Sequence, residues 1–188
     1  MTPDPPPAQP PGDRVPVAGG RAAALAATVR EAAAGWMREL ATLTPEQWRM
    51  RAVNAPDFVR EEDEDENRPV GVIVHHLAVA LGLHRDMARQ IAGGEPTWMP
   101  TWDAPGLAEY NARHASENPD PDQAETLGLL AEASEALAAA CARFTDAELD
   151  LTGPAYGRDM TTEAFVRKVA VGHGHWHLSS IRATVAGG

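Results

Sequence analysis

Apolar residues recur every three or four positions in four long segments of the chain, which is the spacing of one face of a helix. These segments span about 21–43, 67–93, 123–144 and 162–185. Either Thr161 or Thr162 is placed to cap the last of them. The pattern predicts an all-α fold, a four-helix bundle with short connecting helices, in a single domain over residues 21–186.

Local signals mark the connections between these helices. The segments TPEQ (44–47) and TDAE (145–148) each place a threonine three residues before a Gln or Glu, which predicts a capping box and a short helix. Gly93-Gly94 is a typical helix end. A shorter helix is expected over 107–116, and a loop over 153–159.

The net charge of the chain limits the classes of partner that it is expected to bind. The formal net charge is -11, and Lys168 is the single lysine. Phosphate groups are bound by basic patches, so we expect no nucleic-acid binding and no attraction to an anionic membrane. The acidic run 61–66 (EEDEDE) should be exposed to solvent.

The N-terminal segment and the single cysteine indicate the cellular compartment and the reactivity of the thiol. Residues 1–20 are rich in Pro and Gly and lack the apolar core of a signal peptide, which predicts a disordered tail and a cytoplasmic protein. The single cysteine, Cys141, excludes an internal disulfide. Its Ala-rich surroundings predict a buried, unreactive thiol rather than a nucleophile.

The histidines are the most informative residues of the chain. His173 and His177 are one turn apart on the inward face of the last helix, and His76 lies on the inward stripe of the second long helix. Buried imidazoles without partners cost about 1–3 kcal/mol per unsatisfied nitrogen. We therefore expect these three histidines to bind one divalent metal ion. The alternative is that they are core histidines with ordinary hydrogen bonds.

The other histidines have different expected roles. His75 and His175 point about 100° or 200° away from the neighbouring ligands, so neither should share the metal site. His84 lies two turns beyond His76, and it could line the mouth of a pocket together with His114.

At these residues the chain resembles the DinB-like superfamily of metal-binding four-helix bundles. The resemblance is carried by LTPEQW (43–48), VGVIVHHLA (70–78), YNARHA (110–115) and HGHWHL (173–178). It implies His76, His173 and His177 as metal ligands, and it brings Asn111 and His114 towards the site without a defined role. It also implies a homodimer as a common assembly. The start of the second long helix, Asn67-Arg68-Pro69, departs from the usual pattern of that superfamily.

Three neutral histidines leave coordination positions open, as in catalytic sites. Imidazole ligands suit zinc, the first expectation, and also nickel, iron or manganese. The resemblance implies a transferase or isomerase that uses a low-molecular-weight thiol such as mycothiol, because a metal deprotonates a bound thiol. Two alternatives remain: a hydrolase or lyase that uses metal-bound water, and a non-catalytic metal- or ligand-binding module. The sequence HGHWH (173–177) lacks the glutamate base of helical zinc proteases.

Overall fold

The computed structural model describes residues 20–54, 67–99 and 107–187, and most of them are helical. The elements are, in chain order, α1 (Gly20–Leu40), α2 (Pro45–Arg49), α3 (Val70–Ala92), α4 (Leu107–Glu117), α5 (Gln123–Cys141), α6 (Asp146–Asp150), β1 (Thr152–Ala155), β2 (Arg158–Thr161), α7 (Thr162–Phe165), the π-helical segment η2 (Val166–Val171) and α8 (Gly172–Gly187). The predicted tail, apart from Gly20, and the acidic run 61–66 lie outside the described residues.

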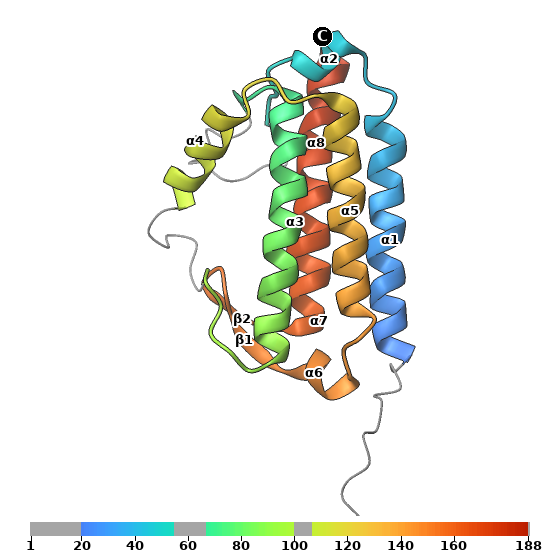
Figure 1. The fold of residues 1–188 in the computed structure, drawn as a ribbon, viewed down its shortest axis with the longest axis vertical. Helices are drawn as coiled ribbons and strands as arrows, with labels where there is room; N and C mark the ends of the chain where they lie inside the picture. Colours follow the sequence, from blue (N-terminus) through green and yellow to red (C-terminus); the bar gives the residue numbers. More distant parts are fainter. Residues whose placement is uncertain (1–19, 55–66, 100–106, 188) are drawn as a thin grey trace, which may run out of the picture.

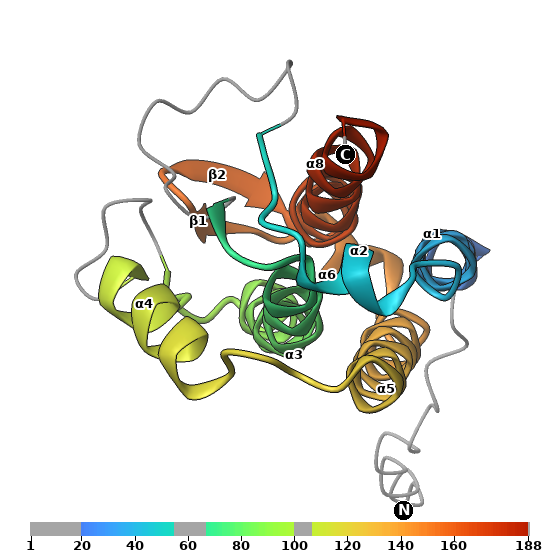
Figure 2. The ribbon, with the colours of Figure 1, turned by 90° about the horizontal axis from the view of Figure 1, so that it is seen from above.

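The described elements include four long helical columns, namely α1, α3, α5 and the continuous run of α7, η2 and α8. These columns lie side by side (Figures 1 and 2). At the two ends of α1, Arg21 bonds to Glu163 of α7, and Glu39 accepts from Arg182 of α8. These two columns therefore run in the same direction. Gln123, which opens α5, bonds to the carbonyl of Leu40 at the end of α1, so α5 runs the opposite way.

Helix α3 runs in the same direction as α5. Ile91, near the end of α3, lies against Gly153 of β1, which shortly precedes α7. Two successive parallel helices need a connection that returns along their length, and α4 is part of that connection (Figure 1). This topology places α4 beside α3, outside the four columns (Figure 2).

Most of the interior between the columns is apolar, as the helical stripes predicted, and the buried histidines are the main exception. In α1 the side chains of Leu25, Val29, Trp36 and Leu40 are buried. Among the described residues no helix is both long and apolar enough to cross a membrane.

Two tryptophans pack directly on helical glycines. A Cβ at Gly174 of α8 would lie 2.2 Å from the ring of Trp36, and one at Gly71 of α3 would lie 2.3 Å from Trp48. Both helix contacts therefore require the absence of a side chain at these positions.

The predicted caps of α2 and α6 are present, because Thr44 and Thr145 each form a complete capping box. At the start of α5, the side chain of Asp122 accepts from the backbone N–H of Glu125. Of the two candidates before the last column, Thr161 is the cap, because its hydroxyl accepts from the N–H of Ala164. Such side chains satisfy backbone donors that a helix leaves free at its first turn.

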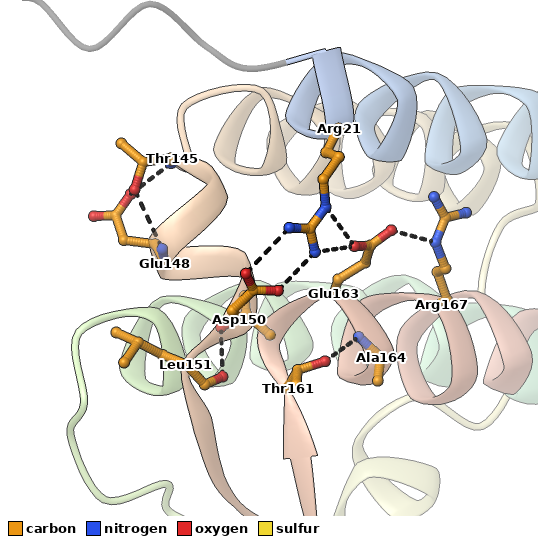
Figure 3. Close-up of polar contacts among 10 residues, drawn as sticks. Arg21, Thr145, Glu148, Asp150, Leu151, Thr161, Glu163, Ala164 and Arg167 are labelled. Carbon is orange, nitrogen blue, oxygen red and sulfur yellow. Dashed lines mark hydrogen bonds and ion pairs between the residues drawn. The ribbon is translucent and has the colours of Figure 1, made fainter.

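An ion-pair network joins the start of α1 to the end of α6 and to α7 (Figure 3). The Arg21 guanidinium donates to Asp150 at 2.8 Å and to Glu163 at 2.7 Å, and Glu163 also accepts from Arg167 at 3.0 Å. These side chains are mostly solvent-exposed, so we attribute to them a role in alignment more than in stability.

The loop predicted over 153–159 is instead a two-stranded antiparallel hairpin of β1 and β2. Its two-residue turn, Tyr156-Gly157, has positive φ at both residues, +52° and +75°, which is the conformation of a tight hairpin turn. The segment contains Pro154 and does not alternate apolar and polar residues, so it carries no local strand signal.

Candidate metal centre

The predicted histidine pair of the last column is closely spaced. The Nε2 atoms of His173 and His177 lie 2.7 Å apart, and their ring centroids are separated by 4.4 Å. His177 is buried and His173 is part-buried. Trp176 stacks on the His177 ring, with an angle of 28° between the planes.

The ring of His76 comes from α3 to meet this pair. Its centroid lies 5.4 Å from that of His173 and 5.6 Å from that of His177, and it is nearly perpendicular to both rings. One nitrogen from each of the three rings lies within 4.8 Å of the other two. Because metal–nitrogen bonds are about 2.0–2.1 Å long, the three rings would have to turn towards one another to share one ion.

The protonation of these rings suits a metal ligand. Burial, followed by the neighbouring imidazoles and Arg68, lowers the pKa of His76 and of His173 well below the ordinary value, so both are neutral near pH 7. The Nδ1 atoms of the same two rings are buried without a hydrogen-bond partner. A set of metal ligands made only of imidazole nitrogens suits zinc, nickel or iron.

His84, one of the pocket candidates, lies next to this cluster. The residue is 3% exposed, and its ring centroid is 5.3 Å from that of His173. Its Nε2 shares a 3.1 Å hydrogen bond with the hydroxyl of Tyr156, at the turn of the hairpin. Burial lowers the pKa of His84 to about 4 and raises that of Tyr156 to about 12. Sequence reasoning missed Tyr156, because only the fold brings the hairpin to α3.

The other two pocket candidates belong to α4. The ring centroid of His114 lies 5.5 Å from that of His76, and its Nε2 lies 2.8 Å from Nδ1 of His75. Asn111 is part-buried, one turn before His114. The contact between His75 and His114 was not predicted, because no local sequence pattern shows that α4 lies beside α3.

His175 lies apart from the cluster, as its position on the helix predicted. It is exposed, and its Nδ1 accepts a 3.4 Å hydrogen bond from Nε1 of Trp36. The other six histidines form one network of ring contacts: His75, His76, His84, His114, His173 and His177.

A π-helical segment directly precedes this part of α8. Residues 166–171 form η2, and His173 follows two positions later. Single π-turns inserted in a helix are frequent at functional sites. No family model, no curated protein and no solved structure matches the chain.

Proposed function

We propose that this protein is a DinB-like, metal-dependent enzyme built on a four-helix bundle, and that His76, His173 and His177 bind one divalent ion. The supporting observation is the convergence of three imidazole nitrogens within 4.8 Å inside the fold. Zinc is the expected ion, with nickel, iron or manganese as alternatives.

The reaction that we propose is S-transfer or thiol-assisted isomerisation on a small organic molecule, with a low-molecular-weight thiol of the mycothiol type. A divalent ion held by His76, His173 and His177 would supply a Lewis acid that lowers the pKa of a bound thiol. The cytoplasm is the proposed compartment, consistent with a single cysteine that is buried and unpaired.

The protein's own groups support this choice over chemistry that needs a carboxylate base. Among the described residues, the candidate ligand cluster contains imidazoles only. His84 is neutral near pH 7 because burial lowers its pKa to about 4, and its hydrogen bond with Tyr156 fixes the ring next to His173. The pair is therefore placed to position a polar group of a substrate or to exchange a proton with it.

The experiment is a thiol titration of the cobalt-substituted protein. Mycothiol, bacillithiol and glutathione are added in turn, and absorption in the near ultraviolet and proton release are recorded. We expect one of them to produce a sulfur-to-cobalt band and to release a proton. His175→Ala should behave like the wild type, whereas His177→Ala should show no band.

A cobalt spectrum that none of these thiols changes would refute the proposal. If that protein hydrolysed or cleaved small esters or amides, the metal-bound-water enzyme would replace it. Without activity, a non-catalytic metal-binding module would be the better description.

A further inference from the structure

The structure contains a second pair of facing imidazole nitrogens. Nδ1 of His75 in α3 and Nε2 of His114 in α4 lie 2.8 Å apart, and the two ring centroids are separated by 5.0 Å. The pair resembles the one formed by His173 and His177, whose facing nitrogens are 2.7 Å apart. Both pairs contact the ring of His76 through one or both of their members.

The geometry of this second pair suits a shared ion. Two nitrogens bound to one ion at about 2.0–2.1 Å, at the angle of neighbouring ligands, are separated by about 2.9–3.4 Å. The observed 2.8 Å lies just below that range, so the two rings would have to move slightly apart to hold an ion between them. His114 is 6% exposed, and its Nδ1 is buried without a hydrogen-bond partner.

We infer that His75 and His114 hold a second divalent transition-metal ion, next to the site formed by His76, His173 and His177. Imidazole donors select zinc, nickel, copper or iron over magnesium and calcium. With two protein ligands, at least half of the positions around the ion are left for water or for a thiolate or carboxylate of a substrate.

The second ion binds more weakly than the first. It has two imidazole ligands instead of three, and an ion in the first site repels it across the ring of His76. Arg68 adds a positive charge whose field reaches both His76 and His114. Binding in two phases is the consequence.

The test is a calorimetric titration of the metal-free, full-length protein with zinc chloride, with bound zinc measured independently by equilibrium dialysis. We expect two equivalents, the second weaker. His75→Gln and His114→Gln should each weaken binding of the second zinc ion by about tenfold or more. Loss of an outer hydrogen-bond partner of a metal ligand already weakens metal binding by about that much, and loss of a ligand itself should cost at least as much. Both variants should keep the first phase, and His175→Gln should keep both.

Circular dichroism checks the fold of each variant. His75 is only part-buried, so His75→Gln serves as the test if His114→Gln unfolds. A single tight equivalent in the wild type, or an unchanged second phase in folded His75→Gln, overturns the inference. A single weak equivalent in the wild type, lost in His75→Gln, would count against the proposed function and not against the second site.

Discussion

Substituting alanine for Gly174 would place a methyl carbon 2.2 Å from Cζ2 and 2.4 Å from Cη2 of Trp36. Carbon atoms in ordinary contact are about 3.5–4.0 Å apart. The overlap therefore exceeds an ångström, and it meets a rigid ring rather than the end of a flexible chain. Trp36 is 2% exposed and its Nε1 donates to His175, so the ring has little room to turn away.

Inserting a carbon into a packed interior costs about 1–3 kcal/mol, and occasionally more. Alanine in a helix recovers about 0.5–1 kcal/mol relative to glycine. Because the overlap at Gly174 is severe, we expect a net loss of about 2 kcal/mol. In a chain of this size that loss lowers the melting temperature by about 4–8 °C.

The matched control is Gly128→Ala in α5, where a Cβ meets nothing within 4 Å. That variant should gain about 0.5–1 kcal/mol, since only the helix preference acts. Urea unfolding of both metal-free variants, followed by circular dichroism, measures the difference. Equal stability of Gly174→Ala and Gly128→Ala would refute the close packing of Trp36 on α8.

Three further outcomes are expected. The metal-free protein should lose stability as the pH falls from about 6.5 towards 4. Burial holds the pKa of His84 and of His114 at about 4, whereas the same histidines in the unfolded chain take up protons near pH 6.5. Urea unfolding at several pH values measures this loss, and constant stability would contradict it. Tyr156→Phe should lower the free energy of unfolding by about 1–3 kcal/mol, because it leaves Nε2 of His84 unsatisfied, and it should retain the zinc stoichiometry. An unchanged free energy of unfolding would show that this hydrogen bond does not stabilise the fold. Cys141 should react with a thiol reagent only in denaturant, because burial raises its pKa to about 12; rapid labelling of the native protein would contradict its burial.

The helices were predictable because their signals are local. The inward stripe of α1 and the capping boxes at Thr44 and Thr145 depend on residues within a few positions of one another. His173 and His177 were paired for the same reason, since one helical turn fixes their separation.

The missed features depend on tertiary contacts. The hairpin is positioned by the hydrogen bond of Tyr156 to His84 and by its backbone bond to Met99, neither of which has a sequence signal. The contact between His75 and His114 arises because α4 returns beside α3. Spacing along a helix excluded His75 from the first site, but it could not show which ring of another helix His75 would meet.

The metal content of the purified protein tests the central claim most directly. Elemental analysis after extensive dialysis should find close to one tightly held divalent ion in the wild type and in His175→Ala. It should find none in His76→Ala, since that change removes the ligand contributed by α3. Retention of the ion by folded His76→Ala, or its loss from folded His175→Ala, would contradict a site shared by these two helices.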